Sequence, residues 1–161
     1  MRVWLSLGSN IDRERNIRGA LRDLTAEFGQ LVVSQVYECQ AVGFDGDPFY
    51  NLVVGIDSER SPLELARAMR AIEDAHGRTR GGDKFAPRTL DIDLLTYGDS
   101  VLNAGPLRLP RDEILKYAFV LGPLAEVAGA ERHPVDGRNY AELWAAFNQA
   151  AQPLRPVEFE P

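Results

Sequence analysis

The sequence predicts an α+β fold with a ferredoxin-like core, in which elements follow the order βαββαβ and both helices cover one face of an antiparallel sheet. Four segments show the period-two alternation or the β-branched content of strands. Two further segments between them carry apolar residues at helical spacing. A hydrophobic content of 45% over 161 residues is enough for one core, so we expect a single domain over residues 1–161.

The first strand and the first helix are predicted near the start of the chain. Val3, Leu5 and Leu7 lie on one face of an alternating segment, which the turn at residues 8–10 ends. A helix is predicted over residues 12–28, because its apolar residues recur at helical spacing, at Ile17, Leu21, Leu24 and Phe28. Gly29 is suited to end this helix.

The second helix has the clearest start signal in the sequence. Ser61 and Glu64 form a capping box, and Pro62 occupies the first helical position. The apolar face of this helix continues to Gly77. The remaining core elements are strands predicted over residues 31–37, 49–56 and 89–98.

The last third of the chain predicts additions that pack on this core. These additions are a short apolar segment at residues 107–109 and helices over residues 119–127 and 140–147. The tail from about residue 150 is rich in proline, so we expect it to be loosely held.

Charge and composition exclude several classes of function. The formal net charge is −6, and a chain this acidic is not expected to bind a phosphate polymer. The single cysteine cannot form an internal disulfide, and no apolar run is long enough to span a bilayer. We therefore expect a cytoplasmic protein with neither nucleic acid nor membrane as a partner.

Two acidic residues on the fourth strand form a candidate metal site. Side chains alternate along a strand, so Leu90, Ile92 and Leu94 face the core while Asp91 and Asp93 share the opposite face. Their α-carbons are then about 6–7 Å apart, and carboxylates this close repel each other unless a cation such as Mg²⁺ binds them. Taken alone, the pair favours the simpler interpretation of two solvated residues on an open sheet face.

A basic segment immediately before this strand changes that balance. It contains Arg78, Arg80, Lys84 and Arg88 against one acid, Asp83. Guanidinium groups beside a metal-binding pair are what transfer of a phosphoryl or diphosphoryl group requires. Glycines in this segment would also permit a lid over a nucleotide, although composition alone fits an ordinary surface loop equally well.

The segment KFAPRTLDIDLLTYG, residues 84–98, resembles the signature of the 6-hydroxymethyl-7,8-dihydropterin pyrophosphokinase family of folate biosynthesis. The opening segment LSLGSNI resembles that family's first strand and turn. The similarity runs from about residue 3 to residue 124. Further landmarks fall where the family has its substrate-binding residues, at Phe49, Tyr50, Asn51, Glu73, Gly77, Arg78 and Phe119.

The resemblance implies transfer of diphosphate from ATP to the pterin hydroxymethyl group, with AMP as the other product. It implies that Asp91 and Asp93 bind two Mg²⁺ ions bridging the ATP phosphates, and that Arg78 and Arg88 join them in catalysis by gripping those phosphates. We also expect a monomer. The nucleotide-binding residues that the resemblance implies are Arg70, Glu73, Arg78, Arg80, Phe85, Arg88, Leu94, Arg108, Arg111 and Tyr117.

For the pterin, the resemblance implies a ring held between Phe49 and Phe119, while Asn51 hydrogen-bonds its edge. Without the resemblance, core packing would be the preferred explanation of both phenylalanines. The pterin-binding residues that it implies are Cys39, Gln40, Val42, Phe49, Asn51, Asp91 and Phe119.

Several positions depart from the family's pattern. A Pro-His pair followed by Tyr is here Pro110, Arg111 and Asp112, and an expected Arg is Tyr117. We hypothesise that Arg111 replaces the histidine as a cation. The other replacements are Phe85 for a lid Trp, Arg70 for Gln, and Cys39 and Gln40 for Thr and Pro.

Two alternative functions follow from these observations. A ferredoxin-like sheet can bind RNA on aromatic strands, but that requires a basic face and RNP-like aromatics, which this sequence lacks. A diverged paralogue would act on a related pterin alcohol or use ATP weakly, and the departures at Arg111, Asp112 and Tyr117 keep this alternative open.

Overall fold

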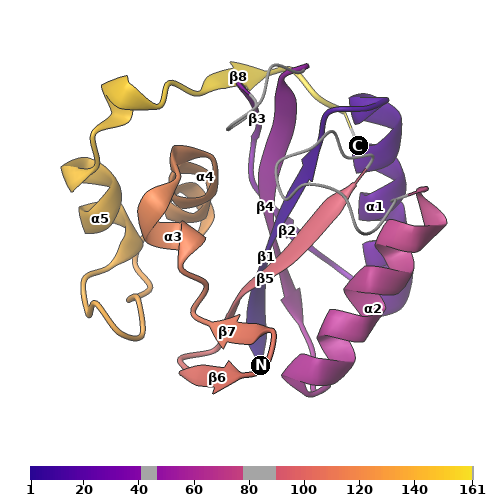
Figure 1. Cartoon of the computed structure of the whole chain (residues 1–161), viewed down its shortest axis with the longest axis horizontal. Helices are drawn as coiled ribbons and strands as arrows, with labels where there is room; N and C mark the ends of the chain where they lie inside the picture. Colours follow the sequence, from indigo (N-terminus) through magenta and orange to yellow (C-terminus); the bar gives the residue numbers. More distant parts are fainter. Residues whose placement is uncertain (41–46, 78–89, 161) are drawn as a thin grey trace.

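The computed structural model describes residues 1–40, 47–77 and 90–160, and within them a six-stranded antiparallel sheet lies between two layers of helices (Figure 1). The strand order is β5-β1-β4-β3-β8, and β2 also pairs with β4. The strands of this sheet are β1 (Arg2–Ser9), β2 (Val32–Val33), β3 (Val36–Cys39), β4 (Phe49–Asp57), β5 (Asp91–Tyr97) and β8 (Arg155–Val157). The predicted α+β fold and its antiparallel sheet are therefore confirmed.

One face of the sheet carries the two core helices, α1 (Arg13–Phe28) and α2 (Pro62–Ala75) (Figure 1). The predicted capping box is present, because Ser61 Oγ accepts from the Glu64 amide and Glu64 Oε1 accepts from the Ser61 amide. The hydrophobic core on this face is built from side chains of α1 and α2 and from side chains that alternate toward it along β1, β4 and β5. They include Val3, Leu5, Leu7, Leu52, Val54, Ile56, Ile92 and Leu94.

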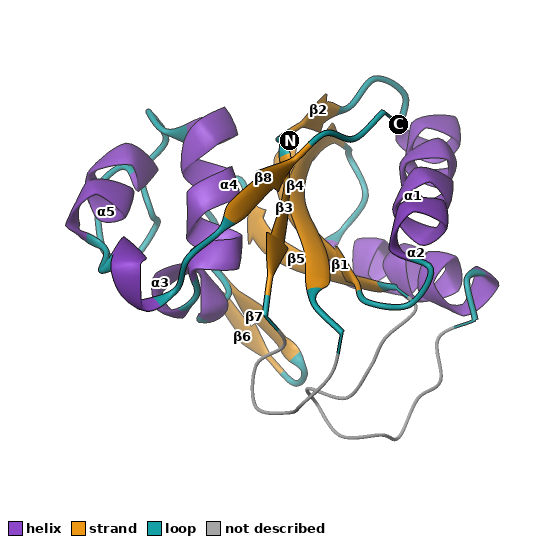
Figure 2. Ribbon diagram, turned by 90° about the horizontal axis from the view of Figure 1, so that it is seen from above, coloured by secondary structure: helices purple, strands orange, loops and turns teal. Residues whose placement is uncertain are grey.

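The opposite face is covered by the C-terminal helices α3 (Glu113–Lys116), α4 (Ala118–Ala128) and α5 (Tyr140–Ala146), as Figure 2 shows from above. Trp4, Val53 and Leu95 point into this second core. Two contacts of Glu126 on α4 tie the helix to the sheet, because its carboxylate accepts from the Tyr37 hydroxyl at 2.7 Å and from the Gln35 amide at 2.8 Å. The predicted helices at residues 119–127 and 140–147 thus form a layer of their own.

The strand predicted over residues 31–37 is interrupted at Ser34 and Gln35. Ser34 Oγ accepts from the Val53 amide at 2.9 Å, and the Ser34 amide donates to the Val53 carbonyl at 2.9 Å. The serine side chain therefore replaces a main-chain partner of β4 at this point. The segment divides into β2 and β3 for that reason.

The C-terminal tail differs from the expectation that it is loosely held. After the 3₁₀ turn η1 (Gln149–Ala151), strand β8 pairs with β3, and Arg155 forms an ion pair with Glu38. Phe159 packs edge-on against Tyr50, with ring centroids 6.5 Å apart. These contacts hold the tail against the sheet edge.

A hairpin connects the sheet to its C-terminal layer. The apolar segment at residues 107–109 is β7 (Leu107–Leu109), which pairs with β6 (Leu102–Ala104) in a small separate sheet. The Arg111 amide then donates to the Leu95 carbonyl at 2.9 Å, which returns the chain to the edge of β5. The segment that leads into α3 is thereby fixed beside β5.

A bulge in β5 shifts its register against β1. Leu94 pairs with Leu5, but Thr96 pairs with Trp4, so Leu95 is the extra residue. Leu94 packs in the first core while Leu95 packs in the second. The side-chain alternation that places Asp91 and Asp93 on one face therefore does not continue past the bulge to Tyr97.

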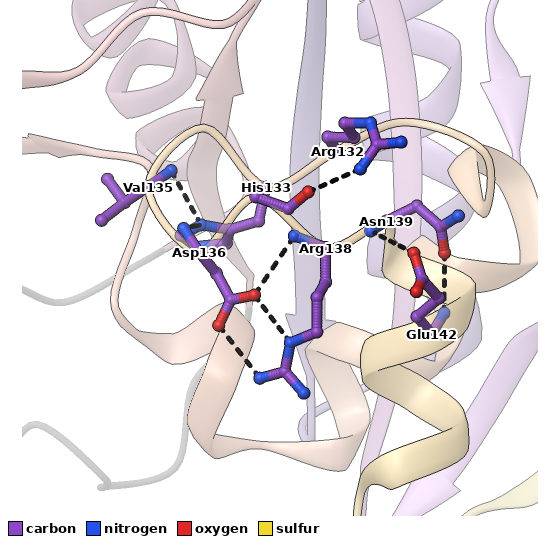
Figure 3. A network of polar contacts seen from close by, with 8 residues as sticks. Arg132, His133, Val135, Asp136, Arg138, Asn139 and Glu142 are labelled. Atoms are coloured by element: carbon purple, nitrogen blue, oxygen red, sulfur yellow. Dashed lines mark hydrogen bonds and ion pairs between the residues drawn. The ribbon is translucent and has the colours of Figure 1, made fainter.

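The loop before α5 is organised by His133, which is buried (Figure 3). Its Nδ1 accepts from the amides of Val135 and Asp136, at 3.1 and 2.9 Å. Arg138 forms an ion pair with Asp136, and Asn139 caps α5. None of the helices in the described part of the chain combines the length and the apolar character needed to cross a membrane.

Candidate active site at one end of the sheet

The two acidic residues of β5 share one face of the sheet, as the strand alternation predicts. Asp91 pairs with Gly8 of β1, and Asp93 pairs with Ser6, while Ile92 between them is buried in the first core. Both carboxylates are half-buried. They lie on the face of the C-terminal helices, at the end of the sheet where the second core stops.

The electrostatics of Asp93 fit a cation-binding role. Burial, and then the neighbouring Asp91 carboxylate, raise the pKa of Asp93 well above its usual range, while Arg111 opposes this shift. A bound divalent cation relieves the same repulsion. No three His, Cys, Asp or Glu side chains are grouped for metal binding among the described residues, so the protein would offer this pair of carboxylates and leave other positions to water and phosphate.

Glu73 of α2 fixes the part of β5 that carries the acids. Its side chain is 4% exposed, and its Oε2 accepts from the Ile92 amide at 2.7 Å. β5 is at the edge of the sheet, so this amide faces away from β1 and takes its partner from the helix. Sequence reasoning expected Glu73 at the nucleotide, and that assignment stays a prediction beside this observed contact.

The predicted pterin residues Asn51 and Phe49 continue the same face onto β4. Gly8 lies between Asp91 on one side and Asn51 on the other, and directly paired residues point to the same face. Asp91 and Asn51 are two strands apart, which corresponds to about 10 Å between their α-carbons. Phe49 pairs with Cys39 of β3, which brings both to this face.

Gly8 provides the flat surface beneath Asn51. A β-carbon at this position would lie 2.8 Å from Asn51 Oδ1 and 3.7 Å from Phe49 Cδ1. Sequence reasoning did not select Gly8, although the segment LSLGSNI contains it. The close approach of a neighbouring side chain explains why glycine is suited to this position.

Cys39 supports the amide of Asn51. Asn51 Nδ2 donates to Cys39 Sγ at 2.8 Å. Burial raises the pKa of the Cys39 thiol to about 12, so the thiol stays protonated near neutral pH. Gln40, the other replaced residue of this segment, is exposed.

Two further predicted residues meet at the start of α4. The rings of Tyr117 and Phe119 are stacked, with centroids 5.1 Å apart and an interplanar angle of 20°. Phe119 was expected at the pterin and Tyr117 at the nucleotide. The structure therefore joins one residue from each predicted set in a single aromatic pair.

The remaining predicted nucleotide residues are dispersed. Arg108 forms an exposed ion pair with Asp112 at 3.0 Å, and Arg70 is exposed on α2. Leu94 packs in the first core, so a nucleotide would meet its main chain rather than its side chain. Arg111 contacts Asp93 and also Glu113, a residue that sequence reasoning missed. Outside the described residues lie Val42, Arg78, Arg80, Phe85 and Arg88.

Known proteins resemble this chain in sequence and in fold. A family model described as 7,8-dihydro-6-hydroxymethylpterin-pyrophosphokinase (HPPK) matches residues 4–129. A Pseudomonas aeruginosa protein named 2-amino-4-hydroxy-6-hydroxymethyldihydropteridine pyrophosphokinase is 39% identical over 149 residues, which cover 90% of this chain and 91% of that protein. A Bacillus subtilis protein of the same name is 37% identical over 129 residues, with 78% and 77% covered.

The solved structures support the fold alone. A crystal structure of Plasmodium falciparum HPPK-DHPS superposes with a TM-score of 0.69 at 14% identity. The match covers 90% of this chain and 43% of that one. The protein described here thus corresponds to less than half of that larger chain.

Proposed function

The chain belongs to the 7,8-dihydro-6-hydroxymethylpterin-pyrophosphokinase family, and we propose that it transfers diphosphate from ATP to the hydroxymethyl group of 6-hydroxymethyl-7,8-dihydropterin in folate biosynthesis. One structural observation carries the proposal at the level of residues. Asp91 and Asp93 lie on the same sheet face as Phe49 and Asn51, so groups suited to a metal and to a flat ring adjoin.

The proposed reaction is an in-line displacement at phosphorus. The pterin hydroxymethyl oxygen forms a bond to the β-phosphorus, and the bond from that phosphorus to the α,β-bridging oxygen breaks. AMP leaves with the bonding electron pair, and the alcohol proton is released. The protein's task in such a transfer is positioning and charge stabilisation.

We propose that Asp91 and Asp93 hold two Mg²⁺ ions together with ATP. The residues fit the ion, because both donors are carboxylates on one face, and burial together with repulsion from Asp91 raises the pKa of Asp93. When bound, Mg²⁺ would neutralise the charge that develops on the phosphates. The Glu73 contact to the Ile92 amide would keep both carboxylates in register with that site.

For the pterin, we propose that Asn51 recognises the ring edge and that Phe49 and Phe119 contact its faces, as the family resemblance implies. The amide of Asn51 is buried and oriented by Cys39 on one side and Gly8 below. A buried amide needs complementary partners, which a pteridine edge provides. Phe119 would have to leave Tyr117 or accept the pterin on its other face.

For the triphosphate, we propose that Arg78 and Arg88 grip the transferred group while Arg80 and Phe85 contact the nucleotide. This assignment rests on the resemblance, because all four residues lie outside the described part of the chain. Arginines suit this role, since the guanidinium group binds phosphate through two parallel hydrogen bonds.

The decisive experiment is incubation of the purified protein with ATP, Mg²⁺ and 6-hydroxymethyl-7,8-dihydropterin. The proposal predicts equimolar AMP and pterin diphosphate. Formation of ADP instead, or of no nucleotide product under conditions where the Pseudomonas aeruginosa relative is active, would overturn it. Omitting the pterin is the control for hydrolysis of ATP.

A diverged specificity is the second candidate, and the structure offers an observation in its favour. Two positions that depart from the family pattern lie in the site, where Arg111 contacts Asp93 and Tyr117 stacks on Phe119. Steady-state rates with the expected pterin and with related pterin alcohols distinguish the two. A higher kcat/KM for another pterin alcohol would establish the diverged specificity.

We further propose that the enzyme acts as a cytoplasmic monomer. The described residues of the proposed metal and pterin sites adjoin one another on a single sheet face. Size-exclusion chromatography with light scattering tests this proposal, and a stable dimer would contradict it.

A further inference from the structure

Arg111 bridges two acids at the edge of the candidate metal site. Its Nε lies 2.7 Å from Glu113 Oε2, and its Nη2 lies 3.6 Å from Asp93 Oδ1. About a third of the Arg111 and Asp93 side chains is exposed, at 32% and 33%. The guanidinium is therefore in contact with a proposed metal ligand while it stays anchored to a different carboxylate.

The backbone fixes where this guanidinium can reach. The Arg111 amide donates to the Leu95 carbonyl, two residues along β5 from Asp93. Glu113 is the first residue of α3 and is the second residue after Arg111. Both acids are thus within reach of one arginine without movement of the main chain.

We propose that Arg111 is an internal counter-ion that competes with magnesium for Asp93, and that Glu113 is a positioning residue that holds Arg111 away from it. This inference rests on the proposed function, because it takes Asp91 and Asp93 as the magnesium ligands. It assigns Glu113 the task of setting the Mg²⁺ concentration that the site requires.

The two distances support this division of roles. The ion pair with Glu113 is the closer of the two, at 2.7 Å against 3.6 Å for Asp93, although neither contact has the geometry of a hydrogen bond. Arg111 is therefore held mainly by Glu113. Loss of the Glu113 charge would strengthen the attraction of the guanidinium to Asp93, and a closer Arg111–Asp93 pair would occupy an oxygen that Mg²⁺ needs.

A direct role of Arg111 on the ATP phosphates makes the opposite prediction. A phosphate ligand that is removed raises the KM for ATP and leaves the Mg²⁺ requirement unchanged at saturating ATP. A counter-ion that is removed frees Asp93 and lowers the Mg²⁺ requirement. The sign of the change in Mg²⁺ dependence therefore distinguishes the two roles.

The experiment compares the full-length protein with Glu113→Gln, Arg111→Gln and the double variant. The first readout is the Mg²⁺ concentration that gives half-maximal rate at saturating ATP and pterin. The second readout does not depend on turnover. The unfolding temperature is measured with α,β-methylene-ATP, an analogue that cannot undergo the transfer, at increasing Mg²⁺ concentrations. The value compared is the Mg²⁺ concentration that gives half of the maximal rise in unfolding temperature.

We expect Glu113→Gln to raise the half-saturating Mg²⁺ concentration roughly tenfold, as is typical for residues that support metal ligands. Arg111→Gln should lower it. In the double variant the value should equal that of Arg111→Gln, because Glu113 acts through Arg111. Asp57→Asn is the matched control, since this acid pairs with Arg2 at the opposite end of β1 and should leave the value unchanged.

Either of two results would overturn the inference. One is a Glu113→Gln effect that is equally large with and without Arg111, which would show that Glu113 acts directly through its charge. The other is an Arg111→Gln protein whose Mg²⁺ dependence is unchanged. If Glu113→Gln does not fold, Arg111→Gln alone decides. Failure of the wild-type protein to form AMP would refute the proposed function instead, and the unfolding readout would still test the inference.

Discussion

Glu73 of α2 accepts a hydrogen bond at 2.7 Å from the main-chain amide of Ile92, the residue between the two acids of β5. A helix on one face of the sheet thus fixes an edge strand whose carboxylates serve the other face. The contact joins the stability of the core to the geometry of the candidate metal site.

Glu73→Ala should destabilise the protein by about 1–3 kcal/mol, because the buried Ile92 amide loses this acceptor. Urea denaturation measures the change. Glu73→Gln is the matched control, since its amide oxygen can still accept and a smaller loss is expected. Equal stability of Glu73→Ala and the wild-type protein would show that the contact contributes nothing.

Asp91→Asn and Asp93→Asn should each reduce turnover by at least about a hundredfold, since a metal ligand contributes several kcal/mol to the transition state. Neither variant should unfold at a lower temperature in the absence of Mg²⁺, because repulsion between the two carboxylates is removed. Steady-state kinetics and thermal scans test the two expectations. Asp99→Asn, an exposed acid just beyond β5, should keep normal turnover.

Gly8→Ala should weaken pterin binding more than ATP binding. The added β-carbon would lie 2.8 Å from Asn51 Oδ1 and would displace the amide that we assign to the ring edge. The separate KM values for pterin and ATP provide the measurement.

The control for Gly8→Ala is Gly55→Ala, on the same strand as Asn51 but beside Trp4, where the new β-carbon would lie 2.5 Å from Trp4 Cζ3. It should lower stability and leave the KM for pterin unchanged. A Gly8→Ala enzyme with normal KM for both substrates would contradict the proposed position of the pterin.

His133 should make stability fall in mild acid. Burial lowers the pKa of His133 below the usual 6.5, although the Asp136 carboxylate opposes this shift. The Nδ1 atom accepts hydrogen bonds from two main-chain amides, which requires the neutral form of the ring. A lowered pKa in the folded state means full stability above pH 6.5 and a progressive loss as the pH falls below it, because the unfolded chain then binds the proton more readily.

Unfolding free energies above and below pH 6.5, compared between wild type and His133→Asn, measure this contribution. The variant should be less stable above pH 6.5 and should lack this part of the pH dependence. An identical pH profile in both proteins would assign the acid sensitivity to other groups.

Local signals in the sequence predict much of this structure. The strand alternation places Asp91 and Asp93 on one face, and the capping box of Ser61 and Glu64 marks the start of α2. The βαββαβ order follows from such elements, because each signal lies within a few neighbouring residues. The family resemblance then adds functional roles, which remain predictions at the level of individual residues.

Features that depend on contacts between distant segments are not predicted. Ser34 interrupts a β-rich segment because its hydroxyl accepts from Val53, 19 residues away. The Arg111 bridge to Asp93 depends on a hairpin that brings the chain back to β5. The strand at Arg155–Val157 is short and contains a proline, and pairing with β3 rather than propensity accounts for it.

Because of the extra residue in β5, odd-numbered positions face one side of the sheet before the bulge and the other side after it. Leu95 and Thr96 together lie opposite Trp4, so Tyr97 packs toward the first core whereas Asp91 and Asp93, also at odd-numbered positions, face the other way. A relative that lacks this extra residue could therefore keep both aspartates on the same face with a strand that is one residue shorter. Comparisons among relatives should therefore align the two parts of β5 separately.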